Sequence, residues 1–258
     1  MSARRAVTVT GAARAEAADP PRTSRPVIGV LGGMGPEATL DFYAKLIAAT
    51  PASTDQDHLH VIIDSDPSVP DRSAAIAGTG PSAGPQLAAM ARRLEAAGAD
   101  VLVMTCNSAH AFQDEVTAAV GIPFVSIVDE SVARVLVAAP DARRVGVLAT
   151  TGTRDARLYA DAFARRGVDT VEPSGADHDT LMHLIYRVKA GDKGDEVKRA
   201  MRSLADDLVA AGAQAVVAGC TEVPLVLEQV DVRVPLVSST DALVAAVVAI
   251  ATGVRTLD

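Results

Sequence analysis

The two cysteines of this 258-residue chain stand in matching surroundings. Cys106 ends the segment 93–106 and Cys220 ends the segment 207–220, and both segments contain Ala-Ala-Gly-Ala followed by an apolar run. In each copy a glycine stands eight residues before the cysteine, as expected where a helix stops and a buried strand begins. The pattern predicts two thiols presented at the ends of two equivalent strands.

Paired thiols can move a proton in two directions. Each cysteine precedes a predicted helix start, at 107–110 and at 221–224, where free N–H groups would lower a thiol pKa from about 8.5 toward neutrality and hold a carboxylate. One thiolate could then remove a proton from a carbon atom while the opposite thiol returns a proton to its other face. A buried structural role, a disulfide and a metal site of Cys106 with His110 are the weaker alternatives.

Short apolar runs alternate with amphipathic segments along the chain, which is typical of parallel α/β sheets. The predicted strands are 27–31, 60–64, 100–104, 124–128 and 144–148. The predicted helices are 36–49, 85–97, 107–119, 130–139 and 241–252, together with one that follows a Thr-Gly-Thr turn and runs through Arg166.

The second half of the chain repeats the first at an offset of 112 to 117 residues, which indicates a duplicated domain. We expect an α/β fold of two pseudo-symmetric domains, each an open parallel sheet flanked by helices, with the active site in the cleft between them. The first domain comprises 25–130 plus 241–258, because the last helix has no third copy to join. The second domain comprises 131–240.

Composition excludes several classes of function. The net charge of −8 and the 3% content of aromatic residues argue against a nucleic-acid or anionic-membrane partner, and no apolar run reaches the ~20 residues of a membrane span. Residues 1–24 lack the apolar core of a signal peptide and are predicted to be a disordered tail. We therefore expect a cytoplasmic protein with free thiols.

Two further patterns are weak signals. The loop Gly32–Gly35 is neither G-x-G-x-x-G nor a P-loop, so it does not indicate a nucleotide site. His58, His60 and the Asp-His-Asp run at 177–179 are interpreted as loop and surface residues, and no metal is assigned to them.

Four motifs together resemble the cofactor-independent aspartate/glutamate racemases, the aspartate racemase branch in particular. They are Gly-Gly-Met-Gly-Pro at 32–36, Val-Pro-Asp-Arg at 69–72, Thr-Cys-Asn-Ser-Ala-His at 105–110 and Gly-Cys-Thr-Glu at 219–222. The resemblance runs from about residue 26 to the end. It implies an amino-acid racemase without pyridoxal phosphate or metal, which has Cys106 and Cys220 as opposed acid/base catalysts and forms a homodimer.

The resemblance also implies a set of substrate-binding residues. Arg72 and Lys189 would hold the side-chain carboxylate of the substrate, Arg72 as a bidentate fork and Lys189 as a point charge. Asn107, Ser108 and Thr221 would hold the α-carboxylate. Met34 lies in the first glycine loop. Without the resemblance, an Arg after Pro-Asp is typical of a solvated loop, and Lys189 of a cation at a helix C-terminus.

The sequence departs from the family at three positions that the resemblance assigns to the substrate-binding site. Ser108 stands where the family commonly has Thr, which keeps the hydroxyl. Ser65 and Asp66 stand where aspartate racemases tend to carry amides, and an ionised Asp66 would repel a substrate carboxylate unless a cation offset it. Substrate choice therefore stays open. Alternatives are a maleate isomerase, malonate decarboxylase or hydantoin racemase activity, or a non-catalytic small-molecule binding protein.

Overall fold

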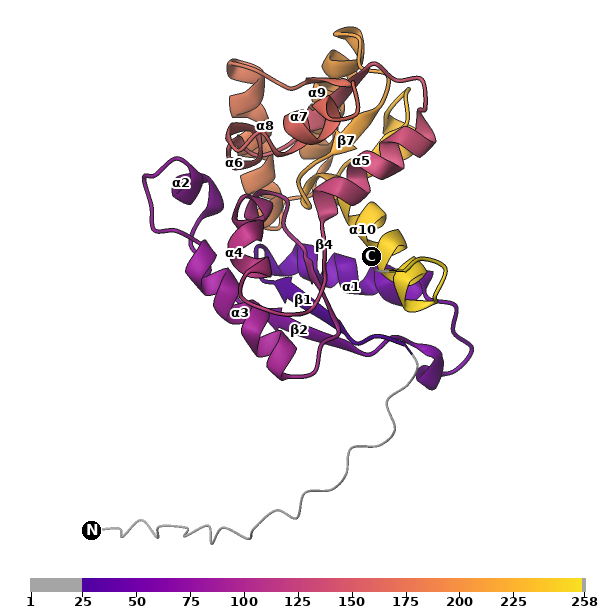
Figure 1. Cartoon of the computed structure of the whole chain (residues 1–258). Helices are drawn as coiled ribbons and strands as arrows, with labels where there is room; N and C mark the ends of the chain where they lie inside the picture. The colour runs from indigo at the N-terminus through magenta and orange to yellow at the C-terminus, as the bar shows by residue number, and fades with distance from the viewer. Residues whose placement is uncertain (1–24, 257–258) are drawn as a thin grey trace, which may run out of the picture.

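The structure is a computed structural model that describes residues 25–256, so the predicted tail at 1–24 lies outside the described residues. Two four-stranded parallel sheets form the centres of two lobes (Figure 1). Their strand orders, β2-β1-β3-β4 and β6-β5-β7-β8, are the same order in two successive halves of the chain. The expected pair of similar α/β units is therefore confirmed.

The bounds of the regular elements follow the alternation of strand and helix. The first sheet consists of β1 (Ile28–Gly32), β2 (Val61–Ser65), β3 (Val101–Met104) and β4 (Phe124–Val125). The second consists of β5 (Arg144–Leu148), β6 (Asp169–Val171), β7 (Val216–Ala218) and β8 (Leu236–Ser238). The α-helices are α1 (Pro36–Ala49), α2 (Arg72–Ile76), α3 (Gly84–Ala96), α4 (Gln113–Thr117), α5 (Ile127–Ala138), α6 (Thr151–Asp155), α7 (Leu158–Ala164), α8 (Ala176–Lys189), α9 (Asp195–Ala210) and α10 (Ser239–Ala251). Short 3-10 helices are η1 (Asp55–Asp57), η2 (Ser108–Phe112), η3 (Val223–Leu225) and η4 (Gln229–Asp231).

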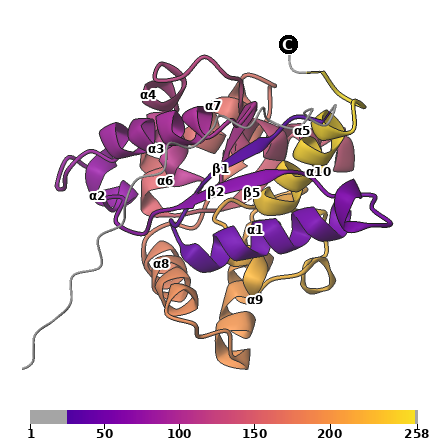
Figure 2. The ribbon, with the colours of Figure 1, turned by 90° about the horizontal axis from the view of Figure 1, so that it is seen from below.

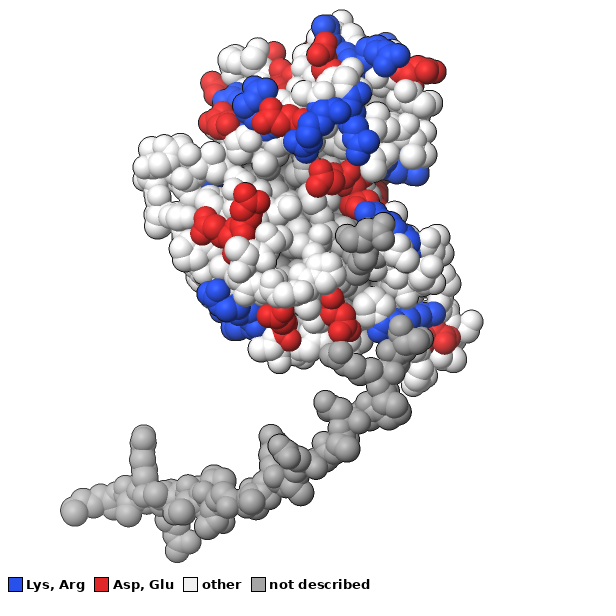
Figure 3. Space-filling model, in the orientation of Figure 1, with Lys and Arg blue, Asp and Glu red and all other residues white. Residues whose placement is uncertain are grey.

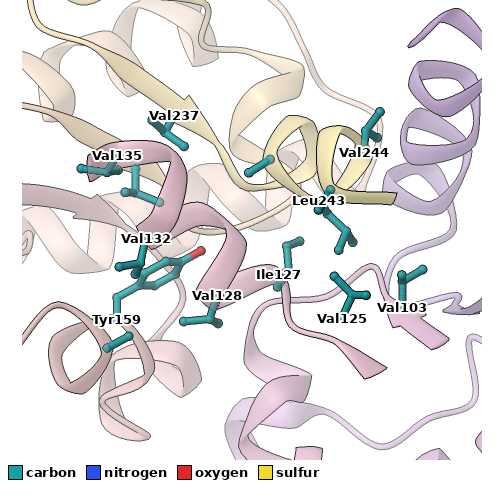
Figure 4. Close-up of a cluster of buried hydrophobic side chains, with 14 of the residues drawn as sticks. Val103, Val125, Ile127, Val128, Val132, Val135, Tyr159, Val237, Leu243 and Val244 are labelled. Atoms are coloured by element: carbon teal, nitrogen blue, oxygen red, sulfur yellow. The ribbon is translucent and has the colours of Figure 1, made fainter. Parts of the chain in front are cut away.

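One hydrophobic core joins the two lobes. It combines residues of both sheets with residues of α5 and α10, which pack against each other, and α10 also packs along α1 (Figures 1 and 2). Figure 4 shows part of this core, where Ile127 and Val128 of α5 lie between Val103 of the first half and Tyr159 of the second. Separate clusters fill the outer faces of the sheets, under α3 in one lobe and under α8 and α9 in the other. The shared core fixes the two sheets relative to each other.

The repeated residues have clear structural tasks. Gly98 and Gly212 follow the last turns of α3 and α9 with φ of 98° and 94°, a left-handed conformation that favours glycine. Ser126 and Ser238 each cap the following helix, where the side chain accepts a hydrogen bond from the third backbone N–H along. These devices set the same entry and exit of the chain in both halves.

Some predicted elements differ from the structure. The expected strand 124–128 ends after two residues because the Ser126 cap begins α5 at Ile127, so α5 runs across the expected domain boundary at 130/131. The expected helix 107–119 is divided into η2 and α4 at Phe112, whose φ and ψ of −110° and 16° are not helical. The expected helix after the Thr-Gly-Thr turn is divided into α6 and α7 at Arg157, which has a left-handed φ of 53°.

The surface carries charges of both signs. On the face that Figure 3 shows, Lys and Arg side chains alternate with Asp and Glu side chains, so this face has no continuous basic surface. Within residues 25–256, the helices are all too short or too polar to cross a membrane.

Candidate functional site

A pocket of about 100 Å³ lies where the carboxyl ends of the two sheets meet, and both cysteines line it. Each cysteine follows an inner strand of its sheet, β3 or β7, by two residues, and each is 5% exposed. The lining residues are Met34, Asp71, Arg72, Ser73, Cys106, Asn107, Ser108, Thr150, Thr153, Met182, Ile185, Tyr186, Lys189, Cys220, Thr221 and Glu222. The structure thus brings the two thiols, far apart in the chain, to one small cavity.

The side chains next to the two thiols are different. The sulfur of Cys106 lies 3.5 Å from the hydroxyl of Ser108. The thiol of Cys220 instead donates to Oε2 of Glu222 at 3.0 Å, and Glu222 is only 3% exposed. Burial, and then the negative charge of Glu222, raise the pKa of the Cys220 thiol well above its usual value, although Lys189 acts in the opposite direction.

The expectation of a lowered pKa at both cysteines is therefore wrong for Cys220. It rested on α-helices starting behind each thiol, but the segments that follow are the short 3-10 helices η2 and η3. A long helix dipole is absent at either position, and at Cys220 burial and a neighbouring carboxylate dominate.

Lys189 connects the end of α8 to both cysteine-bearing lobes. Its ammonium group lies 3.0 Å from Oε1 of Glu222 and donates to the carbonyl oxygen of Met34 at 3.4 Å. Burial alone lowers the pKa of Lys189, but Glu222 and the two cysteines outweigh it, so the pKa is raised from 10.5. The ammonium group stays charged and already has a buried carboxylate partner in the pocket.

Arg72 lies at the start of α2, and its guanidinium group donates hydrogen bonds to several backbone carbonyls. Nη1 donates to the carbonyls of Val69 and Pro70 at 3.1 and 3.0 Å, and Nη2 donates to that of Met34 at 3.4 Å. Its Nε is buried and has no hydrogen-bond partner among the described residues. A bound carboxylate is the kind of group that would satisfy such a donor.

The two halves of the chain contact each other beside the pocket, through Gly152 and the pocket residue Ser73. The backbone N–H of Gly152 in α6 donates to the hydroxyl of Ser73 in α2 at 3.2 Å. A Cβ placed on Gly152 would lie 2.9 Å from that hydroxyl oxygen, so the approach requires a glycine here. This contact holds α2, and with it Arg72, beside the second lobe.

Other expected site residues fall into two groups. Met34, Asn107, Ser108 and Thr221 line the pocket. Ser65 and Asp66 are not among the lining residues.

Asp66 is held by its own loop and by side chains of α3. Its carboxylate accepts hydrogen bonds from the backbone N–H and hydroxyl of Ser68 and from Gln86, and lies 3.9 Å from Arg93. In this arrangement the charge of Asp66 is directed to these partners rather than to the pocket.

Glu222 and several residues of the second half were not expected in the site. Glu222 follows Cys220-Thr221 directly, so its place in the motif was the available signal. Thr150 precedes the Thr-Gly-Thr segment that corresponds to the first glycine loop, and Thr153 is the last residue of that segment. The sequence gave no sign that three α8 residues line the pocket, because their spacing is typical of the apolar face of a helix. These residues are Met182, Ile185 and Tyr186.

The alternatives to acid/base cysteines also have a structural outcome. Both cysteines are free thiols. His110 uses both ring nitrogens in the fold: Nε2 accepts from the N–H of Ile127 at 3.1 Å, so Nδ1 carries the proton and donates to the carbonyl of Cys106 at 2.9 Å. In the described part of the chain, His, Cys, Asp and Glu form no group of three that could hold a metal ion.

Comparisons with known proteins agree with this geometry. Residues 31–247 match the family model described as Asp/Glu/Hydantoin racemase. The chain is 26% identical over 233 residues to the broad specificity amino-acid racemase RacX of Bacillus subtilis, covering 84% of this chain and 94% of the relative.

Solved structures give the same result. The aspartate racemase of Picrophilus torridus superposes with a TM-score of 0.74 at 28% identity, covering 90% of this chain and 96% of that one. An aspartate racemase homologue from Pyrococcus horikoshii superposes with a TM-score of 0.71 at 26% identity, covering 88% and 99%.

Proposed function

Because this chain belongs to the Asp/Glu/hydantoin racemase family, we propose that it is an amino-acid racemase that interconverts L- and D-aspartate or a related acidic amino acid. The observation that carries the proposal is the pair of thiols, which reach one pocket from the equivalent strand ends of two sheets. The similarity to an aspartate racemase and to a broad-specificity amino-acid racemase supports the same reaction class.

The proposed reaction is a two-base proton transfer at Cα. The thiolate of one cysteine takes the Cα proton, so that the C–H bond breaks, an S–H bond forms and the electron pair stays on the substrate as a carbanion. The thiol of the other cysteine then gives its proton to the opposite face. In the resting site the Cys220 thiol keeps its proton and donates a hydrogen bond to Glu222, which suits Cys220 to the role of proton donor in one direction, and the two cysteines exchange roles in the reverse direction.

The polar side chains of the pocket support an acidic substrate. The buried Nε of Arg72 has no partner among residues 25–256, and a side-chain carboxylate would accept from it. Asn107, Ser108 and Thr221 line the same pocket beside the cysteines and offer donors to the α-carboxylate.

A broad-specificity racemase of neutral amino acids is the second candidate. The charge of Lys189 is already balanced by Glu222 at 3.0 Å, and Met182, Ile185 and Tyr186 bring apolar groups to the pocket wall. Both features favour a substrate whose side chain carries no negative charge.

Deuterium exchange tests the reaction class and the substrate together. L- and D-aspartate, and each enantiomer of a panel of neutral and acidic amino acids, are incubated separately in D2O while Cα deuterium is followed by NMR. We expect Cα deuterium from either enantiomer of the true substrate. Absence of exchange with every amino acid tested would show that the chain is not an amino-acid racemase.

The role of each cysteine is tested by substituting one cysteine at a time with serine. Cys106→Ser and Cys220→Ser should each lower racemisation by about 100-fold or more, since positioned acid/base groups contribute that much. Each variant is the control for the other, because the remaining thiol can still exchange the proton of one enantiomer. Full racemisation by either variant would remove that cysteine from the mechanism.

A further inference from the structure

Tyr159 of α7 contacts the loops of both cysteines, although it does not line the pocket. Its hydroxyl donates to Oδ1 of Asn107 at 2.6 Å, and Asn107 directly follows Cys106. Its ring packs against Gly219, which directly precedes Cys220: a Cβ placed on Gly219 would lie 2.8 Å from Cε2 of Tyr159. One side chain therefore spans the two segments that present the thiols.

The Asn107 amide is held in one orientation. Its Oδ1 accepts from Tyr159, and its Nδ2 donates to the hydroxyl of Ser239 at 3.0 Å. This orientation gives both ends of the amide a hydrogen-bond partner, so the side chain is held from two sides. Because an amide nitrogen has two protons, the fixed orientation leaves one N–H for the pocket that Asn107 lines.

Tyr159 is built to remain the donor in this pair. It is 1% exposed, and burial raises its pKa above the usual value, so the hydroxyl keeps its proton. Ser131 donates its own proton to the carbonyl of Ile127 at 2.6 Å, so toward Tyr159 its oxygen is an acceptor, at 3.2 Å. Oδ1 of Asn107, at 2.6 Å, is the nearer acceptor. The single tyrosine proton therefore goes to the nearer Asn107 oxygen.

The surroundings make Tyr159 rigid. Its ring lies in the core shared by the lobes, beside Val128 and Val132 of α5 (Figure 4). The partners of the Asn107 amide thus come from α7 and from the start of α10, so the packing between the lobes determines where this amide points.

We propose that Tyr159 is a positioning residue that sets the two cysteine loops against each other and aims the Asn107 amide at the substrate. The inference rests on the proposed racemase activity, for which Asn107 is a binding group. Because a single hydroxyl makes the hydrogen bond to Asn107, Tyr159→Phe removes this hydrogen bond and keeps the packing of the ring.

A double-mutant cycle on racemisation tests the proposal. Tyr159→Phe should raise KM and lower kcat/KM by about tenfold, the size expected when one buried hydrogen bond is lost. In the Asn107→Ala background the same change should alter kcat/KM by less than about twofold, because groups that act through each other are not additive. Equal losses in both backgrounds would overturn the proposal.

Two further variants separate positioning from stability. Ser131→Ala removes the second acceptor of the tyrosine hydroxyl and should leave kcat/KM unchanged. Ser239→Ala removes the second anchor of the Asn107 amide and should reproduce the rise in KM, which keeps the proposal testable if Tyr159→Phe unfolds. A rise in KM with Ser131→Ala, or none with Ser239→Ala, would contradict it.

A measurement without turnover distinguishes this inference from the proposed function. The side-chain amide protons of Asn107, assigned by their loss in Asn107→Ala, should exchange slowly with water in the wild-type protein and quickly in Tyr159→Phe. Slow exchange in a wild-type chain that racemises nothing would refute the function and keep the anchored amide. Equal exchange in both proteins would refute the anchoring role.

Discussion

Replacing Lys189 by Met would leave the Glu222 carboxylate buried without its cation. The charged groups of the two side chains lie 3.0 Å apart and are unequally accessible, since the side chain of Lys189 is 27% exposed and the side chain of Glu222 is 4% exposed. Removing the lysine leaves the Glu222 carboxylate without a counter-ion at a position that water does not reach. Removing the carboxylate leaves the Lys189 ammonium group without a counter-ion, but this group can still turn partly toward solvent.

The accessibilities give the order of the effects. Losing one partner of a fully buried pair costs 3–5 kcal/mol, so we expect Lys189→Met to lower the free energy of unfolding by about 3 kcal/mol. Glu222→Gln should cost about 1.5 kcal/mol, because the partly exposed ammonium group is rehydrated. The double variant leaves no stranded charge and should cost about 2 kcal/mol, which makes the coupling energy about 2.5 kcal/mol.

Urea unfolding of the four proteins measures this cycle, with free energies extrapolated linearly to water. The matched control is Glu196→Gln, which removes one of the two carboxylate partners of Arg187 near the same end of α8, where the Glu196 side chain is 74% exposed. The control should cost less than about 1 kcal/mol, as exposed pairs do. A coupling energy for Lys189 and Glu222 below about 0.5 kcal/mol would refute the assignment of a buried, coupled pair.

Two other predictions follow from groups near the pocket. Burial lowers the pKa of His110 from 6.5 to about 4, so its contribution to stability is complete above pH 6.5 and is lost as the pH falls toward 4. The wild-type free energy of unfolding should lose about 3 kcal/mol more than that of His110→Asn between pH 7 and pH 4, and equal losses would contradict the buried neutral imidazole. Asp66→Asn should change kcat/KM for aspartate by less than about twofold, because the carboxylate bonds to Ser68 and Gln86 outside the pocket, whereas a tenfold gain would place Asp66 in the path of the substrate.

Sequence predicted best the elements whose signals are local. The helix 36–49 and the strand 144–148 have the predicted bounds, because Pro36 starts the helix and uninterrupted apolar runs mark buried strands. The strand predicted at 124–128 failed through a competing local signal: Ser126, followed by Asp129, is also an N-cap, and the cap decided where α5 begins.

The site was predictable where the chain repeats itself and unpredictable where distant elements meet. Duplication pointed to Cys106 and Cys220, and both line one pocket. The partners of these thiols depend on tertiary structure: Lys189 reaches Glu222 only because α8 packs over the second sheet. Tyr159 gave no signal, because a buried tyrosine in a helix reads as ordinary core.

The unequal surroundings of the two thiols are consistent with a reaction in which only the Cα atom of the substrate is approached equivalently from two sides. In the proposed racemisation, the enantiomers can keep their carboxylates and ammonium group in nearly the same places while the Cα proton changes face. The protein then needs equivalent groups at the two proton positions and nowhere else. Cys106 and Cys220 are repeated, whereas Arg72 and Lys189 each occur in one half.

The duplicated backbone therefore has a narrower task than the duplicated sequence implies. It places two sulfur atoms at the ends of β3 and β7, with the same glycine stop before each strand. The proposed reaction needs no matching copy of the side chains that would bind the rest of the substrate, since such a copy would create a second carboxylate site that no substrate fills. We therefore expect substitutions in α2 and α8 to change substrate choice while the cysteine loops remain unchanged. Substitution of Arg72 and Lys189 alone tests this expectation.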